Sequence, residues 1–289
     1  MSASAQTPVS TYAHPDALVG TDWVKEHLGR PGIRLVEVDV DTKAYDAGHI
    51  PGAVGFNWQT QLQDQLRRDI ISKDAFELLL GGAGITREDT VILYGDNNNW
   101  FAAYGFWLFK LYGHRDVRLM NGGRVKWLNE DNKPLTTEAT VVSSTRYLAS
   151  DPDLSLRAFA PAVIEASRAA ASNLVDVRSP DEFTGKIIAP PGMSETAQRA
   201  GHIPGAKSVP WSTAVQADGS FRPADELHEI YLGKAGLDRS KPTIAYCRIG
   251  ERSSHTWFVL RYLLGLEHVT NYDGSWTEYG NLIGVPIER

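Results

Sequence analysis

Short apolar runs alternate with longer helix-like segments along this chain, and the whole order occurs twice. Runs typical of buried strands occupy residues 35–38, 91–94 and 117–119 in the first half, and residues 174–177, 243–246 and 268–272 in the second. A long apolar helix, over 101–112 or 254–264, is predicted between the last two runs of each half. Because strands that alternate with helices form parallel sheets covered on both faces, the pattern predicts an α/β fold.

The two halves also match each other residue by residue. Residues 90–135 align without a gap on residues 242–287, and the letters GHIPGA occur at 48–53 and again at 201–206. A duplication of this length predicts two domains of one ancestry. We expect an N-terminal tail over 1–17, a first domain over 18–135, a polar linker over 136–156 and a second domain over 157–289.

Composition narrows the functional classes. The net charge is -6, and no run of like charges supports binding to nucleic acid. The polar start has no signal-peptide pattern, and no apolar stretch approaches the roughly 20 residues that span a bilayer, so we expect a soluble, cytoplasmic protein without membrane contact. The single cysteine excludes an internal disulfide and a multi-thiolate zinc site. With no metal-ligand spacing and no nucleotide-binding glycine motif, we expect no cofactor.

The two copies differ at the turn after the middle strand, where open α/β sheets bind ligands. The first copy has Gly95, Asp96 and three asparagines, followed by Trp100. The second copy has a loop that looks catalytic, composed of Cys247, Arg248, Ile249, Gly250, Glu251, Arg252 and Ser253.

Each residue type in this second loop suits an anionic substrate. A cysteine attacks as thiolate, and both a helix start and arginines favour that charged form over the thiol, whose pKa is ordinarily about 8.5. Gly250 lets the loop curl so that backbone N–H groups point inward, while Arg248 and Arg252 bring forked donors for oxyanions. A lone cysteine is usually a buried core residue. Because of these neighbours, that interpretation is less favoured for Cys247 than a catalytic one.

Spacing separates the possible cysteine chemistries. Cysteine-dependent phosphatases place five residues between Cys and Arg, whereas four separate Cys247 from Arg252. The shorter loop encloses a smaller group and favours transfer of a sulfur atom. A phosphatase or arsenate reductase, and a persulfide-carrying interaction module, stay as alternatives of other classes.

The duplicated domain, GHIPGA in both copies, NGGRVKW, YDGSWTEY and YCRIGERSSHTWFVLR resemble tandem-domain rhodaneses, the thiosulfate sulfurtransferases of bacterial type, over residues 16–288. The resemblance implies two rhodanese-like domains, each a mainly parallel sheet covered by helices, of which the first is catalytically silent. It implies that Cys247 takes the outer sulfur of thiosulfate as a persulfide, releases sulfite and passes the sulfur to cyanide or a thiol. A protein thiol is a possible acceptor, and no oligomeric state is implied.

The resemblance also assigns roles to single residues. Cys247 becomes the nucleophile, Arg252, Arg248 and Arg178 bind substrate, and Asp176 is the partner of Arg178. The two arginines of the loop favour thiosulfate as donor. Glu182 stands where mammalian thiosulfate enzymes carry a second arginine, with Lys186 nearby but off register, which keeps 3-mercaptopyruvate open. The possible pocket wall comprises Trp211, Trp100, Phe101 and Lys186.

Overall fold

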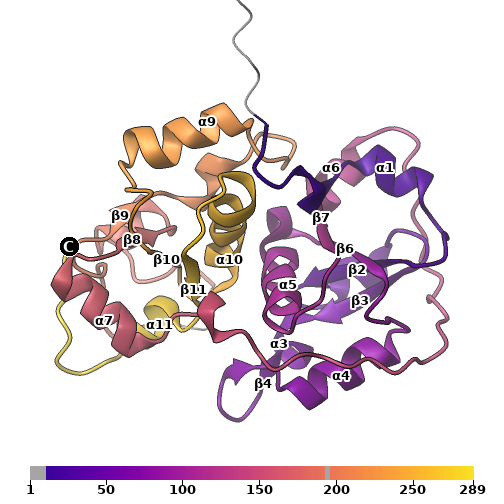
Figure 1. Cartoon of the computed structure of the whole chain (residues 1–289), viewed down its shortest axis with the longest axis horizontal. Coiled ribbons are helices and arrows are strands. Elements are labelled where there is room, and N and C mark those ends of the chain that lie inside the picture. Colours follow the sequence, from indigo (N-terminus) through magenta and orange to yellow (C-terminus); the bar gives the residue numbers. More distant parts are fainter. Residues whose placement is uncertain (1–10, 193–195) are drawn as a thin grey trace, which may run out of the picture.

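The computed structural model describes residues 11–192 and 196–289, which form two parallel sheets covered by helices (Figure 1). The first sheet has the order β1 (Leu18–Val19), β7 (Val117–Met120), β6 (Thr90–Tyr94), β2 (Ile33–Asp39) and β3 (Ala53–Asn57). The second has the order β11 (Val269–Tyr272), β10 (Thr243–Tyr246), β8 (Asn173–Asp176) and β9 (Lys207–Ser208). All pairings within these two sheets are parallel, so the α/β prediction is confirmed.

Helices connect the strands in the predicted alternation. In the first half they are α1 (Thr21–Glu26), α2 (Lys43–Ala47), α3 (Trp58–Gln61), α4 (Lys73–Gly82), α5 (Trp100–Leu111) and α6 (Gly123–Asn129). In the second half they are α7 (Ala160–Ala169), α8 (Pro180–Phe183), α9 (Ala224–His228), α10 (Glu251–Phe258) and α11 (Ser275–Tyr279). A small antiparallel hairpin, β4 (Gln63–Asp64) with β5 (Asp69–Ile70), follows α3.

The two copies share a backbone hydrogen bond between the repeated GHIPGA segment and the end of the copy. The backbone N–H of His49 donates to the carbonyl of Thr136 over 2.9 Å, and that of His202 donates to the carbonyl of Glu288 over 2.8 Å. Both histidines belong to the repeated GHIPGA segment, and each bonds the end of its own copy. Residues 137–153, in the predicted linker, contain no helix or strand and run along the first domain, where the Thr145 N–H donates to the Gly81 carbonyl.

The equivalent helices α5 and α10 pack against each other between the two sheets (Figure 1). Phe106 of α5 lies edge-on to the Phe258 ring and to the Tyr262 ring, with 4.9 Å between centroids in each case. Residues 101–109 are all buried, which explains why this helix is apolar on every side. One continuous apolar core therefore joins both domains.

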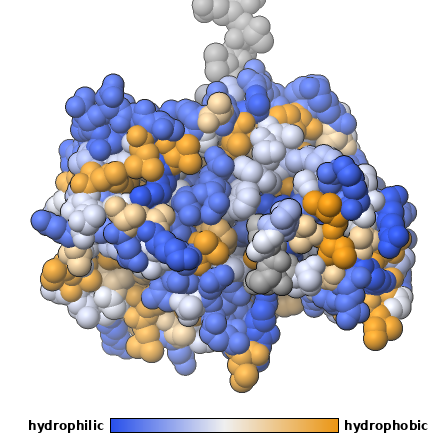
Figure 2. Space-filling view, turned by 180° about the vertical axis from the view of Figure 1, so that it is seen from behind, coloured by the Kyte–Doolittle hydropathy of each residue, from blue (hydrophilic) through white to orange (hydrophobic). Residues whose placement is uncertain are grey.

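The surface differs from this interior. On the face seen in Figure 2, hydrophobic residues form small separate groups among polar ones, as is usual for folded proteins. In residues 11–192 and 196–289, no helix has the length and apolar character required to cross a membrane.

Candidate active site

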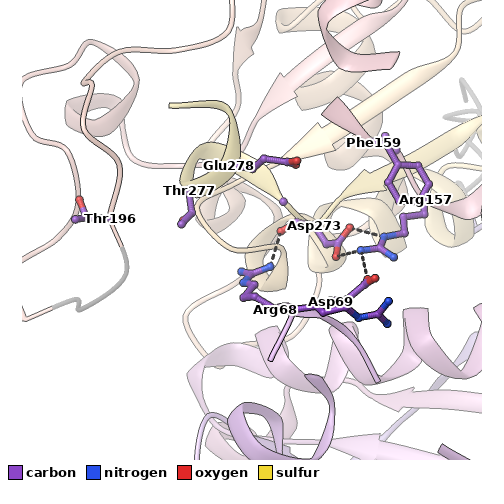
Figure 3. A pocket seen from close by; sticks show the side chains of 11 residues that line it. Arg68, Asp69, Arg157, Phe159, Thr196, Asp273, Thr277 and Glu278 are labelled. Atoms are coloured by element: carbon purple, nitrogen blue, oxygen red, sulfur yellow. Dashed lines mark hydrogen bonds and ion pairs between the residues drawn. The ribbon is translucent and has the colours of Figure 1, made fainter. Parts of the chain in front are cut away.

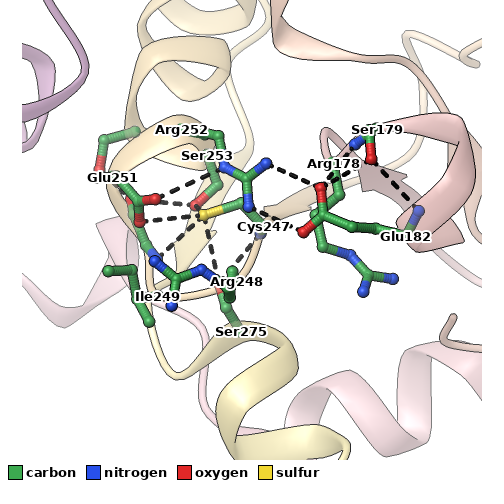
Figure 4. Close-up of polar contacts among 12 residues, drawn as sticks. Arg178, Ser179, Glu182, Cys247, Arg248, Ile249, Glu251, Arg252, Ser253 and Ser275 are labelled. Atoms are coloured by element: carbon green, nitrogen blue, oxygen red, sulfur yellow. Dashed lines mark hydrogen bonds and ion pairs between the residues drawn. The ribbon is translucent and has the colours of Figure 1, made fainter. Parts of the chain in front are cut away.

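The loop of residues 247–251, here called the Cys247 loop, leaves the carboxyl end of β10 and enters α10 (Figure 4). The turn after β11 holds this loop in place. Ser275 Oγ accepts the Cys247 N–H over 3.0 Å, while the carbonyl of Cys247 accepts the N–H of Trp276 and that of Arg248 accepts the N–H of Thr277, each over 3.1 Å. The catalytic cysteine predicted from the sequence is thus anchored to two adjacent strand ends.

The Cys247 loop curls around its sulfur. Gly250 has φ +104°, and a Cβ there would lie 2.9 Å from Asp273 Cα, so a side chain has neither the backbone conformation nor the space. The Gly250 N–H donates to Cys247 Sγ over 3.1 Å, and the Ser253 and Ser275 hydroxyls lie 3.6 and 4.0 Å from it. The inward N–H predicted for this loop is therefore present at Gly250.

The electrostatic surroundings of the sulfur are less simple than the sequence indicates. Cys247 is fully buried, and Glu251 Oε2 lies 3.4 Å from Sγ. Burial and the Glu251 carboxylate raise the pKa of the thiol, and they outweigh the lowering by Arg252 and Ser253. The lowering expected from the arginines is present at Arg252, but the net shift of the pKa is upward, because the expectation from the sequence leaves out desolvation and Glu251.

Arg252 is held by Glu182, the residue that departs from the mammalian pattern. Its Nη1 and Nη2 donate to the two carboxylate oxygens over 3.1 and 3.2 Å. In Figure 4 the Arg252 side chain lies between Cys247 and Glu182. Both side chains are buried, with exposed fractions of 7% and 0%, so this pair is an internal ion pair rather than a surface one.

Arg178 lies deeper in the second domain. Its guanidinium donates to Asp176, the predicted partner, over 2.6 Å and to the carbonyl of Gly201 over 2.7 Å. It also lies over the Trp276 ring, 4.5 Å from the centroid, and is fully buried. The geometry confirms the pairing with Asp176; a direct contact between Arg178 and substrate stays a prediction.

Aromatic residues from both domains meet beside Arg252. Trp100, at the start of α5, lies edge-on to Trp211 with 4.7 Å between centroids, and the guanidinium carbon of Arg252 lies 5.8 Å from the Trp100 ring. Phe101 instead packs toward Trp58 in the core of the first domain. Lys186 is 71% exposed and paired with Asp181, so it does not join this aromatic group.

The first domain also contacts the Cys247 loop directly. Arg68, in the turn of the β4–β5 hairpin, donates from Nη2 to the Ile249 carbonyl over 3.2 Å. Beside this contact lies a cavity of about 660 Å³ between the hairpin and the turn after β11, where Arg157 bridges Asp69 and Asp273 (Figure 3). Cys247 is not among the residues that line it.

Several residues near the sulfur were not singled out by the sequence. Arg68 lies 181 residues from its partner in the loop, in a hairpin that carries no motif. Ser275 was the easier one to find, because the resembling YDGSWTEY segment includes it and the first copy has Gly123 at the aligned position. Among the described ranges, 11–192 and 196–289, no group of three or more His, Cys, Asp or Glu is arranged to hold a metal ion.

Comparison with known proteins agrees with this geometry. The Rhodanese-like domain family matches residues 20–130 and 160–282, once in each copy. A "Putative thiosulfate sulfurtransferase" of Saccharopolyspora erythraea is 58% identical over 275 residues, which cover 95% of this chain and 96% of that protein. "Sulfur carrier protein TtuD" of Thermus thermophilus is 53% identical over 282 residues, covering 96% of this chain and 98% of that protein.

A solved structure has the same architecture. The crystal structure described as a 3-mercaptopyruvate sulfotransferase of Escherichia coli superimposes with a TM-score of 0.77 at 26% identity, covering 90% of this chain and 98% of that one. The fold and the loop thus define a two-domain α/β protein of the sulfurtransferase class. The chain belongs to the rhodanese family, in its tandem-domain form.

Proposed function

We propose that this protein is a thiosulfate sulfurtransferase that works through a persulfide on Cys247. The observation that carries the proposal is the position of Sγ, which accepts the Gly250 N–H and lies in the Cys247 loop with Arg248, while Arg252 follows in the first turn of α10. The name of the 58% identical relative supports thiosulfate as donor.

The proposed cycle has two displacements at one sulfur. The thiol first loses its proton, and Glu251 Oε2, at 3.4 Å, is placed to accept it. The Cys247 thiolate attacks the outer sulfur of thiosulfate, the S–S bond of the donor breaks, and sulfite leaves with the bonding electron pair. Cyanide or a thiolate then attacks the terminal sulfur of the persulfide, and the Cys247 thiolate departs.

The loop supplies stabilisation where negative charge develops. The Gly250 N–H faces the sulfur at 3.1 Å, so it would donate to the thiolate between turnovers. The first domain is proposed to be silent, because its aligned position is Gly95 and the chain has no second cysteine.

Two observations favour related functions. The similarity to the sulfur carrier of Thermus thermophilus favours a protein thiol as acceptor. The similarity to the structure described as a 3-mercaptopyruvate sulfotransferase, together with Glu182 next to Arg252, favours 3-mercaptopyruvate as a second donor.

The deciding experiment compares donors on wild type and Cys247→Ser. We expect thiocyanate to form from thiosulfate and cyanide with the wild type only, and intact-mass measurement after thiosulfate treatment to detect one added sulfur atom on the wild type only. A higher kcat/KM with 3-mercaptopyruvate would change the donor, and hydrolysis of an aryl phosphate without sulfur transfer would overturn the proposal in favour of a phosphatase.

A further inference from the structure

The buried partner of Arg252 changes the charge that a substrate meets. Arg252 uses both terminal nitrogens of its guanidinium on Glu182, and its Nε lies 3.5 Å from Glu251 Oε1. The fork that the sequence offers to an oxyanion is therefore occupied by two carboxylates of the protein itself. Arg252 stays charged, but much of its positive potential is offset where a ligand would bind.

Glu182 is firmly fixed in this position. Its Oε2 also accepts the backbone N–H and the hydroxyl of Ser179, each over 3.0 Å, while Ser179 Oγ accepts the Glu182 N–H. This reciprocal pair is a capping box at the start of α8. Turning the carboxylate away from Arg252 would break the cap as well as the ion pair. The negative charge is thus a built-in part of the site.

The formal charges of Arg248, Glu251, Arg252 and Glu182 sum to zero, and Arg68, bonded to the Ile249 carbonyl, adds one positive charge at the edge of the loop. Arg248 and Arg252 contribute two positive charges, and Glu182 and Glu251 contribute two negative ones. The Coulomb energy between two groups is proportional to the product of their charges. The repulsive free energy that one fixed carboxylate adds to binding is therefore twice as large for a dianion as for a monoanion. The site therefore differs from the strongly electropositive loop that the Cys-Arg-Ile-Gly-Glu-Arg motif suggests by itself.

We propose that Glu182 is a specificity-determining residue: it positions Arg252 and lowers the positive potential at Cys247, which selects against dianions relative to monoanions. In the sulfurtransferase cycle, on which this step of the inference rests, the effect weakens the binding of thiosulfate and of the departing sulfite more than that of a singly charged donor. Glu182 acts through Arg252 and through its field, so it is a positioning residue and not a catalytic one.

The chain offers a closely matched pair of variants. Glu182→Gln removes the charge and keeps an amide that can complete the capping box. Asp181→Asn removes the same charge one residue earlier, from a half-exposed carboxylate that pairs only with Lys186 among the ion pairs of the described residues. A change seen with Glu182→Gln alone therefore reports the buried position and not the net charge of the protein.

The first measurement is steady-state transfer to cyanide from thiosulfate and from 3-mercaptopyruvate. Two unit charges about 8 Å apart, at an effective dielectric constant of about 30, change an affinity about tenfold. We expect Glu182→Gln to lower KM for thiosulfate about tenfold more than KM for 3-mercaptopyruvate and to tighten inhibition by sulfite, with Asp181→Asn within about twofold of wild type. Equal KM changes for both donors would overturn the proposal.

The second measurement does not need sulfur transfer. Iodoacetate and iodoacetamide alkylate the same thiol, but only iodoacetate carries a negative charge, so their rate ratio at fixed pH reports the potential near Sγ. We expect the ratio to rise about tenfold in Glu182→Gln and to stay unchanged in Asp181→Asn. A raised ratio without any transfer activity would reject the proposed function and keep this inference, whereas an unchanged ratio would reject the inference even in an active enzyme.

Discussion

The Cys247 loop follows β10, and the aligned turn of residues 95–99, here called the Gly95 loop, follows the equivalent strand β6. The two loops differ in the groups that accept their inward-pointing N–H donors. In the Gly95 loop, Asn99 Oδ1 accepts the Gly95 N–H over 3.0 Å, and Asn99 Nδ2 donates to the Met120 carbonyl over 2.8 Å. The loop is thus closed by its own amide side chain. In the Cys247 loop, the Gly250 N–H donates instead to Cys247 Sγ over 3.1 Å.

The backbones of the two loops differ as well. The three asparagines of the Gly95 loop have φ values of 46°, 54° and 64°, in the left-handed region, whereas the Cys247 loop reaches such a value only at Gly250. A Cβ at Gly123 would lie 2.2 Å from Asn99 Oδ1. A serine in place of Gly123, like Ser275 in the second copy, would therefore displace the Asn99 side chain from its observed position.

The charged residues beside the two loops also differ in sign. Asp39, aligned with Arg178, is buried next to Asp96 and accepts its N–H over 2.7 Å. Burial, Asp96 and Glu37 raise the pKa of Asp39 to about 9. A strand end of this fold therefore becomes an anion site only when the side chains around it leave room and supply positive charge.

The largest expected effect tests whether position alone suffices. We expect Cys247→Ser to lower sulfur transfer at least about a thousandfold, because an alcohol is a poor nucleophile near neutral pH. Adding Gly95→Cys should restore none of it, since a Cβ at Gly95 would lie 2.2 Å from the Val38 carbonyl oxygen and the thiolate would face Asp96. Thiocyanate formation is the measurement, with circular dichroism as the control for folding. Recovery of wild-type transfer by the double variant would refute this account of the silent domain.

The next effect concerns the fork of Arg252. Arg252→Lys keeps the positive charge but can no longer bond both oxygens of Glu182, so we expect kcat/KM for thiosulfate to fall about ten- to a hundredfold and stability to drop by about 1–3 kcal/mol. Arg222→Lys, in an exposed pair with Glu226, is the control and should change stability by less than about 1 kcal/mol. Unchanged kinetics in Arg252→Lys would remove this arginine from the site.

A smaller effect concerns Asp39, the buried carboxyl at the end of β2 beside the Gly95 loop. The pKa of Asp39, about 9, lies above that of an unfolded aspartate, so the folded state holds its proton longer. This contribution to stability is complete below about pH 4 and is lost as pH rises toward 9. We expect Asp39→Asn to stabilise the protein by about 2 kcal/mol at pH 8 and hardly at pH 4, measured by thermal unfolding.

Asp41 provides the contrast for that experiment. Its side chain is more exposed, and the backbone N–H and the charge of Lys43 lower its pKa, so Asp41→Asn should give no stabilisation at pH 8. If Asp39→Asn lowers stability at pH 8, the raised pKa of Asp39 is refuted.

The smallest effect concerns the thiol itself. Because burial and the Glu251 carboxylate raise the pKa of Cys247, Glu251→Gln should move the pH profile of iodoacetamide alkylation toward lower pH. Glu226→Gln changes the net charge equally at an exposed position and should leave the profile in place. A profile that stays fixed, or moves upward, in Glu251→Gln would mean that Glu251 does not oppose ionisation of the thiol.

Most of the fold could be predicted from the sequence because its signals are local or repeated. The apolar runs became β2, β6, β7, β8, β10 and β11, and the duplication reappears in two sheets. Three edge strands were not predicted: β3, the five-residue strand over 53–57, and the two-residue strands β1 and β9, in which so few residues show no period of their own. The hairpin that carries Arg68 was missed for the same reason.

The candidate site was predictable in identity but not in energetics. The spacing of Cys247 and Arg252 marks the loop, yet the direction of the thiol pKa depends on burial, which the sequence does not express. In the sequence, Glu182 only marks a position where an arginine is expected. Its ion pair with Arg252 could not be predicted, because the two residues lie 70 positions apart. That the charge of Glu182 offsets that of Arg252 can therefore be seen only in the folded structure.

The packing of α5 against α10 has a consequence for how the molecule unfolds. Each helix covers its own sheet and also the partner helix, so separating the domains would expose the rings of Phe106 and Phe258 to water. Burying each such ring contributes about 1.5–3 kcal/mol. The first copy therefore acts as the other half of one cooperative folding unit, and calorimetry should record a single transition in place of one for each domain.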